Sequence, residues 1–203
     1  MTDSPADAEG LLAHAGDVGE IRRLTLFFAD LVDSTALSTQ VEAETYRLVV
    51  GRYREQVVRI VSGCDGHIGS TKGDGLLAVF GHPIRREDDA CRAVQAGLQI
   101  TREVLRLSDQ SQRRFGFGVH VRVGVHRGLV YLDAAQGDFS GLAANVATGI
   151  SGFAPPGAVV VSDVVETLIR NDFELKACAP AAVEGVKEPV MYYVVMSGRA
   201  PAD

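Results

Sequence analysis

Residues 24–30 read LTLFFAD, an apolar run that ends at a carboxylate, Asp30. A continuous run of this kind is typical of a strand buried on both faces, and that strand would present Asp30 at its C-terminal end. Residues 72–80 read KGDGLLAVF, so that Asp74 stands between two glycines ahead of a second apolar run. This is the pattern of a β-hairpin with Asp74 at or near the turn. The sequence therefore predicts two core strands that each carry an aspartate at one end.

The rest of the chain divides into helices and strands by the pattern of its apolar residues. Helices are predicted at residues 41–62, 87–107, 142–153 and 164–169. Further strands are predicted at residues 119–125, 128–132, 158–161 and 190–195, with a turn or bulge between the first two. This order indicates an α+β fold of the βααββαβ kind, with helices packed on one sheet.

Length and charge limit the organisation and the partners of the chain. The 203 residues are enough for one domain with a sizeable core. We expect residues 1–20 to form a flexible arm, residues 21–197 the domain, and residues 198–203 a tail. A net charge of -6 disfavours nucleic acid or an anionic membrane as partner. An anionic small ligand would need local help, for example from a metal ion.

The cysteines and the N-terminus indicate a cytoplasmic protein. Cys64, Cys91 and Cys178 are widely spaced and odd in number, which favours neither a disulfide framework nor a zinc site. The N-terminus is acidic instead of basic, and no apolar run approaches the ~20 residues of a membrane span. His120 and His126 fall in or just after a predicted strand, where a hydrogen-bonded structural histidine is the expectation. The sequence does not exclude that this segment belongs to a longer chain with further domains.

Asp30 and Asp74 are the candidate metal ligands. Two aspartates from adjacent strands could bind two Mg²⁺ or Mn²⁺ ions, which would polarise a phosphoryl group and activate a hydroxyl nucleophile. Spacing alone leaves another interpretation open, in which Asp74 is a turn residue that bonds its own backbone.

Five motifs occur along the chain in a fixed order. They are Phe28-x-Asp30-Leu31-x-x-Ser34-Thr35, Gly73-Asp74-Gly75-Leu76-Leu77-Ala78-x-Phe80, Val123-Gly124-Val125-His126-x-Gly128, Asp138-x-x-Gly141-x-x-x-Asn145-x-Ala147 and Gly185-Val186-x-Glu188-Pro189-Val190-x-x-Tyr193. Each motif is weak alone, but as an ensemble over residues 22–195 they resemble the bacterial type of class III adenylyl and guanylyl cyclase catalytic domain.

The resemblance implies a ferredoxin-like core with an antiparallel sheet, which works as a head-to-tail dimer with active sites at the interface. The implied reaction is attack of the ribose 3′-hydroxyl on the α-phosphate of ATP, which gives cyclic AMP and pyrophosphate. By the same resemblance Asp30, Asp74 and the backbone of Leu31 hold Mg²⁺ or Mn²⁺. Asp138 reads the adenine amino group, so guanine is less expected, and Asn145 orients the ribose.

Three positions depart from the family pattern. The family has a purine-selecting lysine where this chain has Ser70, a transition-state arginine where it has Gly149, and a phosphate-binding lysine where it has Glu184. Removing one preorganised donor typically costs ~10²–10³ in rate. Lys72 shares a face with Ser70 in an extended strand and is a candidate to reach the base or phosphates instead. Its alternative role is an ordinary solvated turn lysine.

Two functions from different classes remain. One is a degenerate cyclase homology domain that is weakly active or inactive as a homodimer, binds a metal or nucleotide, and serves signal transduction. The other is a functional adenylyl cyclase with a variant site. A heterodimer is an alternative arrangement, in which a partner supplies the missing cations to Asp30 and Asp74. Residues 142–153, with Phe139 or Phe153 exposed nearby, are candidates to pack against a second chain.

Overall fold

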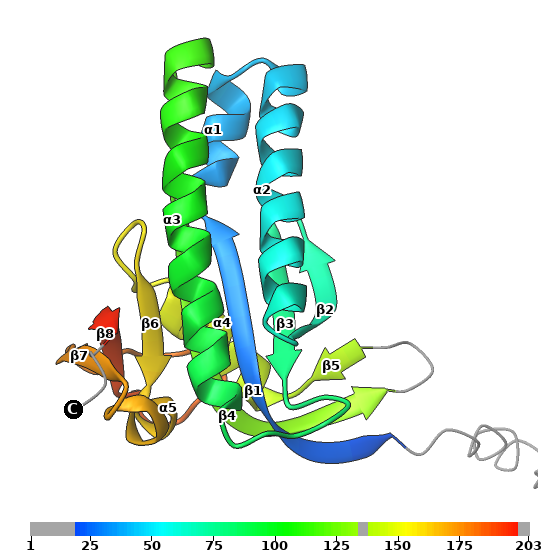
Figure 1. Cartoon of the computed structure of the whole chain (residues 1–203), viewed down its shortest axis with the longest axis vertical. Coiled ribbons are helices and arrows are strands. Elements are labelled where there is room, and N and C mark those ends of the chain that lie inside the picture. Colours follow the sequence, from blue (N-terminus) through cyan, green and yellow to red (C-terminus); the bar gives the residue numbers. More distant parts are fainter. Residues whose placement is uncertain (1–18, 134–137, 199–203) are drawn as a thin grey trace, which may run out of the picture.

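Strand β1 (Glu20–Leu31) lies inside a mainly antiparallel sheet of eight strands (Figure 1). The computed structural model describes residues 19–133 and 138–198. The sheet order is β2-β3-β1-β4-β6-β8-β7, and β5 pairs with β4. The other strands are β2 (His67–Lys72), β3 (Gly75–Phe80), β4 (Val121–Asp133), β5 (Asp138–Ser140), β6 (Val159–Ser162), β7 (Phe173–Ala177) and β8 (Tyr192–Gly198). Of these pairs β4–β6 is parallel. The expected α+β class is confirmed.

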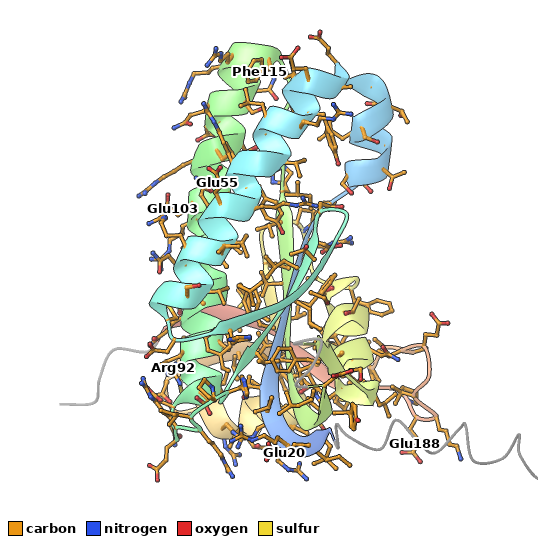
Figure 2. All side chains as sticks on the ribbon, turned by 90° about the vertical axis from the view of Figure 1, so that its right-hand side faces the viewer. Glu20, Glu55, Arg92, Glu103, Phe115 and Glu188 are labelled. Atoms are coloured by element: carbon orange, nitrogen blue, oxygen red, sulfur yellow. The ribbon has the colours of Figure 1, made fainter. Side chains whose placement is uncertain are left out.

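Helices cover both faces of the sheet. They are α1 (Ser34–Gln40), α2 (Ala43–Gly63), α3 (Asp89–Phe115), α4 (Leu142–Ser151) and α5 (Asp163–Ile169). Helices α2, α3 and α5 share one apolar core with the sheet. Helix α4 contributes to two other apolar clusters, which do not include α2, α3 or α5. Side chains fill the space between α2, α3 and the sheet (Figure 2). In the described part of the chain, no helix is both long and apolar enough to cross a membrane.

Strand β1 is apolar on both faces because both of its faces are covered. Successive side chains of a strand point to opposite faces. Phe27 and Ala29 belong to the core under α2 and α3, whereas Leu24 and Leu26 pack with Ala143 and Ala147 of α4. The continuous apolar run therefore predicted the burial of this strand correctly.

Strand β4 corrects one prediction, since it runs without interruption from Val121 to Asp133. It pairs with β1 in one unbroken register from Leu31↔Val121 to Glu20↔Leu132. The expected turn or bulge before Gly128 is therefore wrong. The glycine has another cause, because a Cβ at Gly128 would lie 2.7 Å from the Cβ of Ala143 in α4. Here glycine marks the close approach of a helix to the strand.

Other elements lie beyond the predicted bounds. Helix α3 continues to Phe115, beyond the predicted end at residue 107. The prediction stopped early because the last turns of the helix are polar, although both serines there, Ser108 and Ser111, are buried. The Ser108 hydroxyl accepts a hydrogen bond from the Val119 backbone N–H at 2.9 Å. Apolar periodicity cannot detect such a segment. The bounds of α1, β5 and β7 were not predicted, and each of these elements has seven residues or fewer.

Candidate functional site

The fold brings Asp30 and Asp74 together. Asp30 lies one residue before the end of β1, and Asp74 lies in the turn between β2 and β3, the strand next to β1. The Leu31 backbone N–H donates to Asp74 Oδ2 at 2.8 Å, and the Ser34 hydroxyl donates to Asp74 Oδ1 at 2.9 Å. Both carboxylate oxygens of Asp74 are thus bonded to groups of β1 and α1. The interpretation of Asp74 as a residue that only closes its own turn is not supported.

Arg122 is a third charged residue at this site, and the sequence did not single it out. It is the cross-strand partner of Asp30 in the β1–β4 ladder. Its Nη2 lies 3.3 Å from Asp30 Oδ2, and its Nη1 donates to the Gly152 carbonyl at 3.1 Å. Only the register of β4 reveals this pairing, because Arg122 and Asp30 are far apart in the sequence.

The surroundings of Asp30 favour a cation. Burial raises the pKa of its carboxyl group, Arg122 lowers it and the nearby Asp74 carboxylate raises it, with a net increase. Asp30 Oδ1 is shielded from solvent and has no hydrogen-bond partner among the described residues. A buried oxygen without a partner is costly unless a donor or a metal ion satisfies it.

The donor set fits a hard divalent ion. Mg²⁺ and Mn²⁺ are bound by carboxylate and carbonyl oxygens, and Mg²⁺ often uses only one or two carboxylates. In residues 19–133 and 138–198 no cluster of three or more His, Cys, Asp or Glu side chains forms a metal site. An ion here would therefore depend on Asp30 and Asp74, with backbone and ligand oxygens to complete its coordination.

Helix α4 carries the second group of predicted residues. Asn145 is exposed, and Gly149 follows one turn later. A Cβ at Gly149 would lie 2.5 Å from Val183 Cγ1, because the segment around Val183 packs directly on α4. Glu184 is exposed beside it. Among the described residues no hydrogen bond or ion pair joins Asn145 to either aspartate.

The remaining predicted residues lie on β2 and β5. Ser70 is exposed in β2, next to a register irregularity between Ile68 and Thr71. The backbone places Lys72 at the end of β2 and Asp138 at the start of β5. The side chains of Lys72 and Asp138 lie outside what the structure describes, so their roles stay predictions.

Phe139 corrects another expectation, since its side chain is only 4% exposed. Its ring makes edge-on contacts with His67 and His82, with centroids 5.5 and 5.6 Å away. Phe139 is therefore not available to a second chain, whereas Phe153 is 49% exposed as expected.

His126 is a structural histidine, as expected. Its Nδ1 lies 2.8 Å from the Ser162 hydroxyl, and burial lowers its pKa to about 4. An unfolded chain would protonate this residue near pH 6.5. Its contribution to stability is therefore complete above pH 6.5 and is lost as the pH falls towards 4.

We expect the free energy of unfolding, measured with urea between pH 7 and pH 4.5, to fall less steeply in His126→Gln than in the wild type. The physical reason is that glutamine removes the proton uptake of the unfolded histidine. His120→Gln, the same substitution at an exposed histidine, is the comparison variant. Parallel curves for His126→Gln and the wild type would contradict the assignment.

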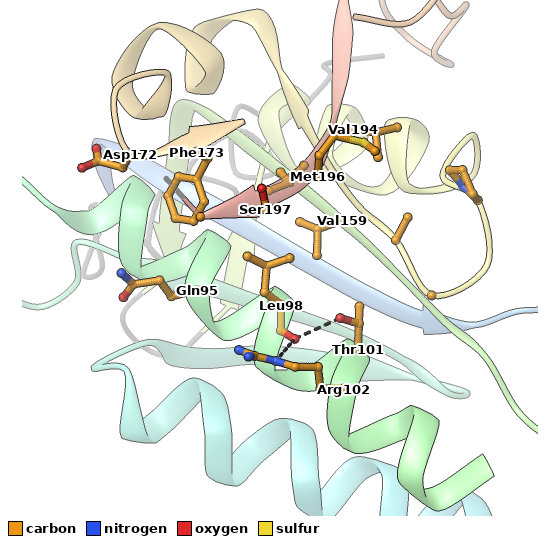
Figure 3. Close-up of a pocket in the computed structure, with 15 residues that line it drawn as sticks. Gln95, Leu98, Thr101, Arg102, Val159, Asp172, Phe173, Val194, Met196 and Ser197 are labelled. Carbon is orange, nitrogen blue, oxygen red and sulfur yellow. Dashed lines mark hydrogen bonds between the residues drawn. The ribbon is translucent and has the colours of Figure 1, made fainter. Parts of the chain in front are cut away.

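A cavity of about 950 Å³ lies between α3 and strands β6 and β8 (Figure 3). Its lining includes the apolar side chains of Leu98, Val159 and Phe173. Thr101 and Arg102 at its edge both donate to the Leu98 carbonyl, at 3.0 and 3.1 Å. Its lining includes neither Asp30 nor Asp74 nor any residue of α4, so it is not part of the candidate site.

Comparisons with known proteins agree with this architecture. The family profile described as adenylate and guanylate cyclase catalytic domain matches residues 17–197. Adenylate cyclase of Streptomyces coelicolor is 30% identical over 169 residues, which are 82% of this chain and 40% of that protein. The pH-sensitive adenylate cyclase MT1302 of Mycobacterium tuberculosis is 28% identical over 203 residues, 98% of this chain and 47% of that protein. The chain thus spans less than half of the length of each of these two relatives.

Two solved structures share the fold. The adenylyl cyclase CyaB from P. aeruginosa has a TM-score of 0.82 at 24% identity, over 92% of this chain and 100% of that one. The guanylyl cyclase Cya2 has a TM-score of 0.82 at 23% identity, over 90% of this chain and 96% of that one.

Proposed function

The chain belongs to the adenylate and guanylate cyclase catalytic domain family, and from this premise we propose that it binds a divalent metal and a nucleotide but is weakly active or inactive as a homodimer. Its role would then be in signalling or regulation within a larger assembly. One observation supports the proposal: Asp74 is bonded to the Leu31 backbone next to Asp30, whereas Val183 occupies the space beside Gly149.

The aspartate half is suited to hold Mg²⁺ or Mn²⁺. Asp30 Oδ1 has no hydrogen-bond partner among the described residues, and Asp74 is fixed in place by Leu31 N–H and the Ser34 hydroxyl. The backbone of Leu31 would be an additional ligand. When bound, the ions would polarise the α-phosphate of ATP and activate the ribose 3′-hydroxyl. Arg122 holds the Asp30 carboxylate and adds positive charge beside it.

The residues predicted to bind the nucleotide, on and near α4, supply fewer of the groups that catalysis needs. Asn145 would orient the ribose and Asp138 would accept a hydrogen bond from the adenine amino group, which favours ATP. The negative charge of the transition state, however, would not be stabilised by the cations of the family. Ser70, Gly149 and Glu184 replace two lysines and an arginine at these positions. Each lost donor typically costs ~10²–10³ in rate. A head-to-tail homodimer repeats the same losses in both of its sites.

A heterodimer is the second candidate function. No hydrogen bond or ion pair among the described residues links Asn145 of α4 to the aspartates within one chain, which supports a site shared between two chains. A partner domain with lysine and arginine at the degenerate positions would complete the site that contains Asp30 and Asp74. A reducing cytoplasm suits either arrangement, because Cys64, Cys91 and Cys178 are free.

Metal binding and turnover test the proposal separately. We expect Mn²⁺ to bind the wild type in a calorimetric titration and to lose affinity by tenfold or more in the double variant Asp30→Asn, Asp74→Asn, because carboxylates bind Mn²⁺ far better than amides do. Cyclic AMP formation from Mn²⁺–ATP at high protein concentration should stay close to that of the double variant. The absence of metal binding contradicts the proposal. Turnover far above the variant would instead establish a functional adenylyl cyclase with a variant site.

A further inference from the structure

A second cavity, of about 520 Å³, lies beside the turn that carries Asp74. We call it the α2 cavity. Its walls are helix α1, helix α2 and the turn between β2 and β3. The lining residues that matter below are Thr35 of α1, then Tyr46, Arg47, Gly51 and Arg54 of α2, and Asp74 of the turn.

Positive charge is in excess in the α2 cavity. Arg47 and Arg54 are seven residues apart, so they lie on the same face of α2 two turns from each other. Neither arginine forms an ion pair in the described part of the chain. The carboxylate in the lining is Asp74, and both of its oxygens already accept hydrogen bonds. The local charge is thus opposite to the net charge of -6 of the whole chain.

Arg54 is the more enclosed of the two arginines. Its Nε is shielded from solvent and has no hydrogen-bond acceptor in the part of the chain that the structure describes. A buried donor of a charged group without an acceptor is destabilising, so an acceptor that enters the cavity would remove this cost. Arg47 is exposed and could bind the same acceptor from the open side.

Gly51 leaves the wall between the two arginines bare. It lies inside α2, where glycine is less favourable than alanine by about 1 kcal/mol. Packing does not require it, because a Cβ at Gly51 would meet no atom of the described residues within 4 Å, apart from its chain neighbours and the backbone of its own helix. The absence of a side chain leaves the cavity wall open at Gly51, between the positions of Arg47 and Arg54 along α2.

We propose that the α2 cavity is a phosphate-binding site, in which Arg47 and Arg54 hold a phosphate or pyrophosphate group. Planar guanidinium groups bind phosphate oxygens in pairs, and such charge-assisted bonds are stronger than neutral ones. The hydroxyls of Thr35 and Tyr46 are further donors in the lining. The bound group is inorganic phosphate, pyrophosphate or the phosphate end of a nucleotide.

This site deepens the proposed function and rests on it for the identity of the natural phosphate compound. It would give the chain cations from α2, where the positions of Ser70, Gly149 and Glu184 supply none. Binding of a simple phosphate does not itself depend on metal or turnover, so the two proposals can fail separately.

Calorimetric titration of the full chain with pyrophosphate, inorganic phosphate and ATP, without divalent ions, tests the site. We expect saturable binding of at least one of them, weakened about tenfold or more in Arg54→Gln and less in Arg54→Lys, because lysine keeps the charge. Arg59→Gln is the matched control, since Arg59 is exposed on the same helix outside the cavity. The strongest of the three ligands identifies the phosphate compound.

Gly51→Ala is the second variant, and it tests whether weaker binding could result from unfolding of the protein. Alanine favours the helix, so the melting temperature should rise while the added methyl group narrows the cavity and weakens binding. The proposal is overturned if none of the three compounds binds the wild type, or if Arg54→Gln and Gly51→Ala bind as well as Arg59→Gln. In Asp30→Asn, a substitution outside the cavity lining, phosphate binding should persist while Mn²⁺ binding is weakened, which separates this site from the proposed function.

Discussion

Mixing this chain with a cyclase domain that lacks its own metal aspartates is expected to raise cyclic AMP production by at least ~10² over either protein alone. The partner should carry lysine and arginine at the positions of Ser70 and Gly149, with alanine in place of both of its aspartates. One of the two interface sites would then contain Asp30 and Asp74 from this chain and the missing cations from the partner. The measurement is initial rate of cyclic AMP formation from Mn²⁺–ATP against the ratio of the two proteins.

The control for this mixture is the same chain with Asp30→Ala and Asp74→Ala. The activity of the mixture should disappear, because neither protein then holds the metal. If the mixture is no more active than its components although sedimentation shows a heterodimer, the complementation proposal is wrong. A high rate for this chain alone would point to the variant homodimeric cyclase instead.

Restoring the arginine on α4 is expected to require a second change at Val183. Gly149→Arg alone should lower the free energy of unfolding by about 1–3 kcal/mol, the usual cost of overpacking, because its Cβ would lie 2.5 Å from Val183 Cγ1. Adding Val183→Ala should recover part of this loss. In a background with Ser70→Lys and Glu184→Lys, the pair should raise turnover by ~10² or more, since it restores a donor to the transition state.

Urea unfolding and cyclic AMP assays on the same four-substitution protein check both parts. The protein with Gly149→Arg but without Val183→Ala is the comparison, and it should be less stable and less active. Equal stability of Gly149→Arg and the wild type would contradict the packing argument. Full stability without any gain in turnover would show that the shape of the pocket has also changed.

The sequence predicted the features that depend on local apolar patterns. The burial of β1 on both faces, the β2–β3 hairpin and the approach of Asp30 to Asp74 follow from runs of residues that any strand of this kind needs. The prediction of a turn or bulge in β4 was wrong, because Gly128 allows the close approach of helix α4 and does not mark a turn. Burial by distant segments was also missed, as Phe139 shows: it is covered by His67 and His82 from other parts of the chain.

Residues that act through the register of the sheet could not be found from sequence. Arg122 became a site residue only when the β1–β4 pairing placed it opposite Asp30. The lack of space for a side chain at position 149 likewise could not be predicted, because it depends on Val183, which belongs to a later segment that packs on α4. The roles of Lys72 and Asp138 remain predictions from the resemblance.

Arg122 has a mechanical consequence, because its guanidinium group is attached at both ends. It contacts Asp30 on β1 and donates to the carbonyl of Gly152, the residue that caps the C-terminus of α4. A displacement of α4 against the sheet would therefore change the bond to Gly152, the contact with Asp30, or both. In either case the position of a helix is transmitted to the electrostatic potential at a carboxylate on the neighbouring strand. Arg122 thus links the position of α4 to the charge that surrounds the Asp30 carboxylate.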